Sequence, residues 1–545
     1  MALPKARLLG TGRFWLGVAA LALVGSLFQA GLFQREVINP GGWPQVLEFL
    51  RAALHPTLSS EFLSLTFNAS LITFAYAVCG LALSLLIGFV GGVLSSEVWW
   101  LSHRSGRSTT RAPWLVARGL FAIPRAIHEV IWGLFFINIF GLDPLSGILA
   151  LGVPFGAITA KVFSEILDET PRQPLNALLN AGASPLTAFC YSLLPQAMPN
   201  LLSYAFYRFE CAIRSASVLG LIGAGGLGYQ ILLSLQALHY EEMWTLIYAL
   251  CLLSGLTDLW SARLRGAELD SNSAPRRRLN IATLTFILTL VFTPLAFVYL
   301  GPNLGKLFAP RTFALLAGVA RDSFPPDFGP DTLRQLVVLS GQTIAMSILA
   351  IVLAGALGFA LSFFAARNLI SPRTEASSSR IIRVARLSLL TITRLLFLIW
   401  RAVPAPVWAL MFLFVFFPGI LPGALALALH NGGILGRLMA ETIENANERP
   451  MRVLQTQGAS ASQAVLYGLL PLTAPQSIAY SLYRWEVCIR ETVIVGLVGA
   501  GGLGRLIQEQ ISSFDYRGLL ASLITLLVLT FIVDVISALA RRAVR

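Results

Sequence analysis

The chain has 545 residues, of which 56% are hydrophobic and 12% charged, and its mean hydropathy is +0.72. These values exclude an ordinary soluble domain and indicate a protein that crosses a membrane many times. The net charge of +13 does not predict a nucleic-acid partner, because the cations flank apolar segments, where anionic lipid and the insertion machinery favour them. The 5 scattered cysteines have neither a disulfide framework nor a metal-binding spacing.

Apolar segments long enough to cross about 30 Å of hydrocarbon as helices recur along the chain. In the first half they are 14–32, 71–94, 115–140, 145–160, 197–221 and 243–259. In the second half they are 281–300, 336–365, 387–417, 420–435, 474–497 and 519–539. We therefore expect about six spans in each half. Span one has a counterpart in the second half, so we expect it to be retained and not cleaved as a signal peptide.

The two halves repeat each other at an interval of 276 residues. SYAFYRFECAIRSASVLGLIGAGGLG (203–228) aligns without a gap with AYSLYRWEVCIRETVIVGLVGAGGLG (479–504), with 14 identities in 26 positions. An even number of spans in each half gives two repeats of the same orientation. We expect an all-α integral membrane fold of two parallel repeats, residues 1–270 and 280–545, joined by a cytoplasmic linker at 271–279. The positive-inside rule places both termini in the cytoplasm, although a basic loop at 301–335 lies on the expected outer side.

Each half contains the sequence GAGGLG, at 223–228 and 499–504. It has the spacing of a dinucleotide-binding fingerprint, but that motif requires a preceding strand, and here an apolar helical segment leads into it. Two interpretations remain: a glycine-rich break in a spanning helix beside the transport pathway, or close packing through small residues. On the first interpretation the pathway includes Gly223, Gly225, Gly226, Gly499, Gly501 and Gly502. A second nucleotide-like segment, GPNLGK at 301–306, is one residue short of a Walker A loop, so we expect no ATP hydrolysis by this chain.

Another shared motif lies between spans four and five. NALLNAGASPLTAFCYSLLP (176–195) aligns with RVLQTQGASASQAVLYGLLP (452–471), and the topology places both on the cytoplasmic side. The motif resembles the EAA loop of ABC importer permeases, which implies a short coupling helix that docks on an ATPase subunit. Asn176 and Arg452 stand where that family has glutamate, and an amphipathic surface loop is the alternative. The coupling residues implied by the resemblance are Gly182, Ala183, Ser184, Leu194, Pro195, Gly458, Ala459, Ser460, Leu470 and Pro471.

With ALALALHNGG (424–433) and FDY (514–516), these motifs make the chain similar to the phosphonate-uptake ABC permease family. The resemblance implies a fold like that of type I ABC importer permeases, in the bacterial inner membrane. It also implies two ATPase subunits on the cytoplasmic side, which bind ATP and magnesium, and a periplasmic substrate-binding protein, with no cofactor on this chain. Such permeases commonly assemble as two copies, which here are fused. The second half is nearer the family pattern, because it has His430 at the position where the first half has Pro154.

Charged residues within the expected spans are the candidate groups for substrate passage. Glu210 and Arg214, and likewise Glu486 and Arg490, are four residues apart and share a helical face, where each pair can form an ion pair. This pairing is either structural, or its arginines, with Arg125 and Arg401 of the third spans, form a weakly cationic route for an oxyanion. The second half is less cationic, because Glu491 replaces Ser215. We expect Asp258 and Asp534 to anchor helices, and a proton relay through His128, Glu129 and His430 is a weaker alternative.

The sequence therefore predicts the permease of an ATP-driven importer for phosphonate, phosphite or a related small oxyanion. A permease of the same class for an amino acid or osmolyte is the first alternative. An ion-coupled secondary carrier or channel is the second. A membrane enzyme ranks last, because the sequence has no cluster of catalytic residues.

Overall fold

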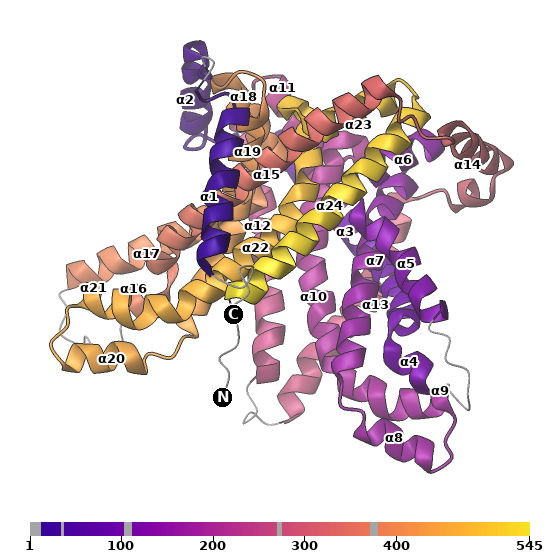
Figure 1. Cartoon of the computed structure of the whole chain (residues 1–545), viewed down its shortest axis with the longest axis horizontal. Coiled ribbons are helices and arrows are strands. Elements are labelled where there is room, and N and C mark those ends of the chain that lie inside the picture. The colour runs from indigo at the N-terminus through magenta and orange to yellow at the C-terminus, as the bar shows by residue number, and fades with distance from the viewer. Residues whose placement is uncertain (1–11, 34–36, 103–111, 270–274, 371–379, 545) are drawn as a thin grey trace. The chain divides into compact units, whose positions relative to one another are not determined.

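The computed structural model describes residues 12–33, 37–102, 112–269, 275–370 and 380–544, and these form a helical protein (Figure 1). The one β-bridge in this part of the chain is isolated and joins Ile38 to Phe416. By its contacts the chain divides into two compact units. The first-repeat unit is Ala52–Arg321, and the second-repeat unit combines Met1–Arg51 with Asp322–Arg545.

The first-repeat unit is built around α3 and α7, two long helices that pack closely along their length. Ser59 caps α3 through its hydroxyl, and the carboxylate of Asp143 caps α7. Glycines at the interface permit the close approach: a Cβ at Gly88 would clash with Thr159. The helices of this unit are α3 (Ser60–Ser95), α4 (Glu97–Ser102), α5 (Ala112–Ala126), α6 (Glu129–Phe140), α7 (Pro144–Glu169), α8 (Gln173–Asn180), α9 (Pro185–Ala188), α10 (Leu194–Leu219), α11 (Gly226–Gln236), α12 (Tyr240–Leu269), α13 (Pro275–Leu300) and α14 (Pro310–Ser323, whose last residues belong to the other unit).

The second-repeat unit has the same organisation, with α15 and α19 as its central pair. A Cβ at Gly436 of α19 would overlap the ring of Phe397, so glycine again permits close packing. The helices of this unit are α1 (Gly12–Gln29), α2 (Trp43–Ala52, whose last residue belongs to the other unit), α15 (Pro330–Ala365), α16 (Arg367–Ile370), α17 (Arg380–Ala402), α18 (Ala405–Val415), α19 (Ile420–Glu444), α20 (Arg449–Thr456), α21 (Ala461–Ala464), α22 (Leu470–Val495), α23 (Gly502–Ser512) and α24 (Tyr516–Val544).

The first span of each repeat packs with the helices of the other repeat. Helix α1 contacts α15 and α24, and α13 contacts α3. Between α13 and α3, the rings of Phe292 and Phe74 meet edge to face with their centroids 6.2 Å apart. After α13, Lys306 Nζ lies 2.8 Å from Asp143 Oδ2. Burial raises the pKa of Asp143, but hydrogen bonds from Lys306 and two backbone N–H groups outweigh it, so the pKa lies below its usual value. The repeat boundaries stay a prediction of the duplication, and the folded units exchange their first spans.

The predicted linker at 271–279 is only partly visible. Residues 270–274 lie outside the described part of the chain, and 275–279 form the start of α13. The terminal residues 1–11 and 545 and the basic segment 104–111, on which the expected topology also depends, lie outside it as well.

Two spans of each repeat are broken: the bend in the third span corrects the expectation of one helix there, and the break after the fifth span falls at the predicted glycines. The third span bends by 88° between α5 and α6, and by 95° between α17 and α18. Proline explains both bends: Pro124 lies near the end of α5, and Pro404 caps α18. The indole of Trp132 in α6 donates to the carbonyl of Pro124 at 3.2 Å and so closes the first bend. The fifth span bends by 57° before α11 and by 67° before α23.

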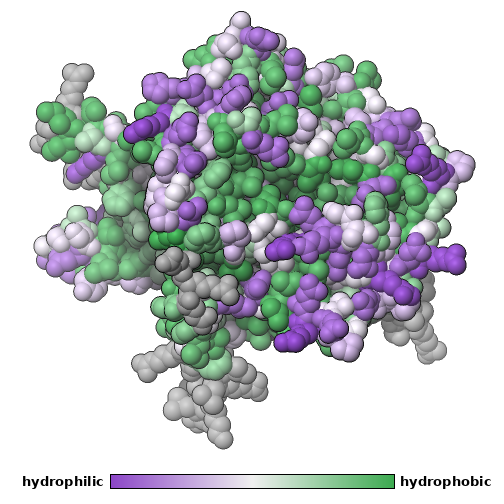
Figure 2. All heavy atoms as spheres, turned by 90° about the horizontal axis from the view of Figure 1, so that it is seen from above, coloured by the Kyte–Doolittle hydropathy of each residue, from purple (hydrophilic) through white to green (hydrophobic). Residues whose placement is uncertain are grey.

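The described helices are apolar enough for a membrane. Five of the described helices are long and apolar enough to cross a membrane, and up to nine spans result if each bent pair of helices counts as one span. The apolar parts of α1 and α13 are shorter, at Phe14–Gln29 and Leu288–Leu300. Large apolar side chains are exposed on many helices, including Leu86, Val298 and Phe531, and Figure 2 shows hydrophobic residues over much of the visible face. This exposure fits a protein surrounded by lipid.

Candidate functional site

The coupling motif of the first repeat folds as two short helices joined by a tight turn. Helix α8 ends before Gly182, whose φ of +88° is a backbone conformation that favours glycine. The Ser184 hydroxyl then accepts the N–H of Thr187 at 3.2 Å and caps α9. A π-helical turn, Phe189–Leu193, leads into α10, so Leu194 and Pro195 start the fifth span.

The second repeat builds the same turn from a different sequence. Gly458 has a φ of +89°, and Ser460 forms a capping box with Gln463 at the start of α21. Leu470 and Pro471 begin α22. A Cβ at Gly182 or Gly458 would meet no atom within 4 Å, so these glycines are required for the backbone conformation and leave the outer face of the turn open. In Figure 1, α8 with α9, and α20 with α21, each lie at one end of their unit.

The coupling helices are anchored to the spans unequally. In the first repeat, Leu175 of α8 and Leu193 are buried in an apolar cluster with Phe163 and Leu167 of α7. Helix α20 buries none of its own side chains, and the corresponding cluster around Leu469 is smaller. Asn176 and Arg452, which replace the expected glutamate, are both exposed. The two turns therefore have the same backbone conformation, but the first coupling helix packs more extensively on the spans than the second.

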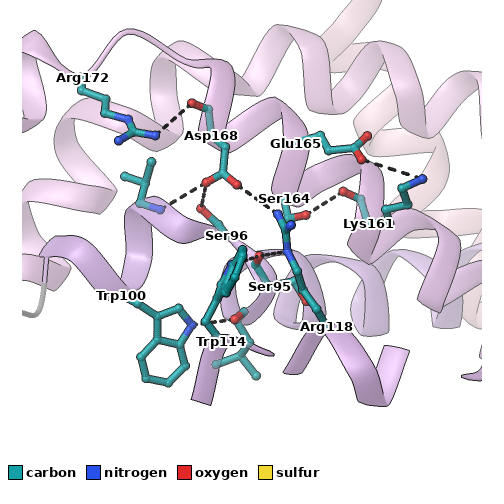
Figure 3. A network of polar contacts seen from close by, with 12 residues as sticks. Ser95, Ser96, Trp100, Trp114, Arg118, Lys161, Ser164, Glu165, Asp168 and Arg172 are labelled. Carbon is teal, nitrogen blue, oxygen red and sulfur yellow. Dashed lines mark hydrogen bonds and ion pairs between the residues drawn. The ribbon is translucent and has the colours of Figure 1, made fainter. Parts of the chain in front are cut away.

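A polar cluster joins the helix ends beside the first coupling helix, and the sequence analysis did not find it (Figure 3). One carboxylate oxygen of Asp168, near the end of α7, accepts from Ser96 Oγ at 2.7 Å and from the N–H of Val98 at 3.2 Å. The other lies 3.4 Å from Arg118 Nη2 of α5. Arg118 Nε also donates to the carbonyl of Ser95, at the end of α3, at 3.1 Å. The cluster thus ties α3, α5 and α7 together five residues before α8.

The second repeat repeats this cluster with a different acid. Arg394 of α17 pairs with Glu444 at the end of α19 and donates Nε–H to the carbonyl of Ala365, the last residue of α15, at 3.0 Å. Glu444 also accepts the N–H of Arg367 at 2.7 Å. Arg118 with Asp168, and Arg394 with Glu444, share the 276-residue interval, which is the signal that could have revealed them.

The predicted ion pair of the first repeat is confirmed. Arg214 Nη2 lies 3.1 Å from Glu210 Oε1, and the two side chains are only 16% and 7% exposed. A second polar group lies nearby along α10: Ser215 Oγ donates to Glu129 Oε1 at 2.6 Å. His128 Nδ1 lies 3.0 Å from the other carboxylate oxygen of Glu129. These contacts connect α10 with the start of α6.

In the second repeat the corresponding acid has a different partner from the one expected. The Glu486 carboxylate bonds to Arg541 of α24, and Arg490 donates Nε–H to the Glu486 carbonyl at 3.2 Å. Helix α24 supplies this partner because it packs along α22. The i to i+4 spacing identified the acid correctly but could not reveal a partner 55 residues away.

The third-span arginines lie at the bends. Arg125 is half-buried in the last turn of α5, and Arg401 is buried in the last turn of α17. Asp258 of α12 is buried and Asp534 of α24 is half-buried, and their role as helix anchors stays a prediction. His430 Nδ1 lies 3.3 Å from the carbonyl of Val403, at the second bend. The structure thus brings Arg401 and His430 to one hinge.

GAGGLG forms the break that the glycines predicted. Gly223, Gly225 and Gly226 have φ values of +101°, +86° and +74°, and the second repeat copies them at Gly499, Gly501 and Gly502. After the break, the N–H of Leu227 is bound by the hydroxyl of Thr73 at 2.8 Å. Gly223 also lines a small cavity with Tyr76, Asp143 and Ser146 among others. Both the break and close packing are therefore present, and a role in the pathway stays a prediction.

Comparisons with known proteins agree with the duplicated motifs. Residues 105–265 and 387–545, together more than half of the chain, each match the family model described as binding-protein-dependent transport system inner membrane component. The chain is 28% identical over 445 residues to the phosphate-import permease protein PhnE of Mycolicibacterium smegmatis, covering 81% of this chain and 80% of that protein. It is 32% identical over 229 residues to the phosphite transport system permease protein PtxC of Stutzerimonas stutzeri, covering 42% of this chain and 77% of that one. A solved structure of the MetNI methionine ABC transporter, inward facing, matches at 22% identity and a TM-score of 0.34, over 38% of this chain and 97% of that chain.

Proposed function

This chain belongs to the family of binding-protein-dependent transport system inner membrane components, and from that premise we propose that it is the whole permease of an importer of small phosphorus oxyanions. One observation carries the proposal of a whole permease: each repeat has its own coupling motif, with glycine in the same left-handed turn. The oxyanion substrate is supported by the relatives named as phosphate-import and phosphite permeases.

The partners follow from the two coupling motifs. We propose that one ATPase subunit docks on α8 and α9 and a second on α20 and α21, and that ATP and magnesium are bound by these subunits. A substrate-binding protein would deliver the anion to the opposite, periplasmic side. The chain would lie in a bacterial inner membrane with both termini in the cytoplasm. The exposed, open outer faces of the Gly182 and Gly458 turns support docking there.

The contacts of the coupling motifs support a way to transmit ATPase closure. A force on α8 would reach α7 and α10 through the apolar cluster at Leu175 and Leu193. The Asp168–Arg118 cluster would carry it to α3 and α5, because one carboxylate links the ends of all three helices. Glu444 and Arg394 would do the same for α15, α17 and α19. Packed, hydrogen-bonded ends move as rigid bodies, and such movement can alternate access to a substrate route.

Of the residues predicted from the sequence, we propose that the third-span arginines and the glycine breaks line the route, and the Glu210–Arg214 pair supports it structurally. Arg125 and Arg401 lie at the third-span bends, and the glycine breaks follow the fifth spans. Bends and glycine breaks are places where a chain can move with small backbone changes. Arginine at such places would favour an oxyanion, since its planar donors match phosphonate oxygens.

Uptake by a reconstituted transporter tests this function. The chain would be placed in proteoliposomes with its partner ATPase and substrate-binding protein, and uptake of labelled phosphate, phosphite and methylphosphonate would be measured with and without ATP. We expect ATP-dependent uptake of at least one oxyanion. ATP-dependent uptake of an amino acid or osmolyte only, with no oxyanion uptake, would refute the proposed substrate class.

A further inference from the structure

Two arginines at matching positions of the repeats, one buried and one half-buried, differ in which atoms accept their N–H groups. Arg208 of α10 and Arg484 of α22 are 276 residues apart and correspond in the duplication. The Nε–H and Nη2–H groups of an arginine point the same way and form a fork for two oxygen atoms. The two arginines can therefore be compared donor by donor.

In the second repeat the fork is occupied by the protein. Arg484 Nε donates to the side-chain oxygen of Asn431, and Arg484 Nη2 donates to Glu491 Oε1 at 2.6 Å. Asn431 Nδ2 donates in turn to Glu491 Oε2 at 2.9 Å. The charge of Arg484 and the donors of its fork are both satisfied inside the unit, as a guanidinium largely removed from water requires.

In the first repeat the same fork has no acceptor. Arg208 is 7% exposed, and among the residues that the structure describes neither its Nε nor its Nη2 has a hydrogen-bond partner. Phe155 replaces Asn431 and lies under the guanidinium, 3.8 Å from Arg208 Cζ to the ring centroid. The ring holds the cation by a cation–π contact and offers no oxygen to its N–H groups.

The acid has also moved. Ser215 replaces Glu491, and the first repeat carries its carboxylate on α6, as Glu129, where the second has Ala405. Glu129 Oε1 accepts a hydrogen bond from Ser215 Oγ at 2.6 Å, and Glu129 Oε2 lies 3.0 Å from His128 Nδ1. The first repeat therefore keeps an arginine and a carboxylate, but the carboxylate does not accept a hydrogen bond from the Arg208 fork. Leaving two donors of a buried cation unbonded is costly, so this state calls for an acceptor from outside the unit.

We propose that the Arg208 fork is a binding site for one tetrahedral oxyanion, phosphate, phosphite or phosphonate, and that the second repeat's equivalent site is closed by Asn431 and Glu491. Two oxygens of such an anion match the fork as the Asn431 and Glu491 oxygens do in the other repeat. The site rests on the proposed oxyanion substrate. It predicts one anion site per chain, although the duplication offers two arginines.

The test is equilibrium binding of radiolabelled inorganic phosphate to the full chain in phosphatidylcholine nanodiscs, with unlabelled phosphite and methylphosphonate as competitors. We expect saturable binding of one phosphate per chain, and Arg208→Gln should weaken it at least about tenfold. The variant Phe155→Asn/Glu129→Ala/Ser215→Glu copies the closed fork of the second repeat, and it should lose binding while keeping the folded chain, checked by size-exclusion profile and thermal unfolding.

The reciprocal variant is the matched gain-of-function control. Asn431→Phe/Ala405→Glu/Glu491→Ser gives the second repeat the open arrangement of the first, so two phosphates per chain are expected. No phosphate binding by the wild-type chain, or wild-type binding by both Arg208→Gln and the closed-fork variant, would overturn the proposal. Phospholipid retained through Arg208, detected by native mass spectrometry together with absent phosphate binding, would also overturn it, because the occupant would then be a lipid headgroup.

Uptake separates this site from the function on which it rests. In the reconstituted transporter, oxyanion uptake with an unchanged KM in Arg208→Gln would refute the site and leave the proposed function intact. No oxyanion uptake by the wild-type transporter would refute the function itself.

Discussion

Removing one or both members of the Glu210–Arg214 pair tests what this intramembrane charge does. The two side chains are 7% and 16% exposed and 3.1 Å apart, so Arg214→Ala takes the guanidinium away from a buried carboxylate. Breaking a buried pair in this way costs about 3 kcal/mol or more, whereas removing both partners is often close to neutral. We expect Arg214→Ala to lower thermal stability and oxyanion uptake strongly, and Glu210→Ala/Arg214→Ala to restore most of both.

The assay is ATP-dependent uptake at equal membrane abundance, with thermal unfolding of each purified variant. Arg490→Ala is the matched control from the second repeat: Glu486 keeps its contact with Arg541 there, so this variant should be milder than Arg214→Ala. A double variant that is as stable as the wild type but transports as poorly as Arg214→Ala would refute the structural role, because it would show that the arginine acts on the anion itself.

Other parts of the account make separate predictions. Gly182→Asp or Gly458→Asp places a side chain at a φ near +88° or +89°, which costs about 1 kcal/mol or more, and should abolish uptake while the chain still inserts, as membrane fractionation would show; normal uptake would argue against docking at these turns. Asp168→Asn should weaken the link between α5 and α7 and lower the uptake obtained per ATP hydrolysed, and an unchanged ratio would exclude this route of transmission. The pKa of Asp143 is lowered in the folded chain, so its stabilising effect is present above the unfolded pKa and lost as the pH falls through the folded value. Lys306→Gln removes one of the hydrogen bonds that lower the pKa of Asp143, so this pKa should rise. Loss of stability with acid should then begin at a higher pH in thermal unfolding, and identical pH profiles of the two proteins would contradict this.

Much of the architecture could be predicted because it is local or repeated. Hydropathy identified the spans, the 276-residue interval identified the two repeats, and the duplicated coupling motif identified two segments whose glycines, Gly182 and Gly458, have the same left-handed backbone conformation. The third-span bends were missed even though Pro124 and Pro404 signal them, since the apolar run continues on both sides.

Contacts between distant segments could not be predicted in the same way. Helix α1 is apolar on all sides, so its sequence does not say which helices it contacts, and the exchange of first spans is visible only in the fold. Glu486 looks the same in sequence whether its partner is four residues away or on α24. Arg208 is unusual only once its neighbour Phe155 is known, because the acceptors of the equivalent Arg484 come from two helices.

The subunit ratio of the transport-active complex tests the central claim most directly. Native mass spectrometry of the purified complex, assembled with its ATPase and active in ATP-dependent uptake, would count each subunit. A single fused permease with two coupling motifs predicts one copy of this chain with two ATPase subunits. Two copies of the chain in the active complex, or one chain with a single ATPase subunit, would contradict it.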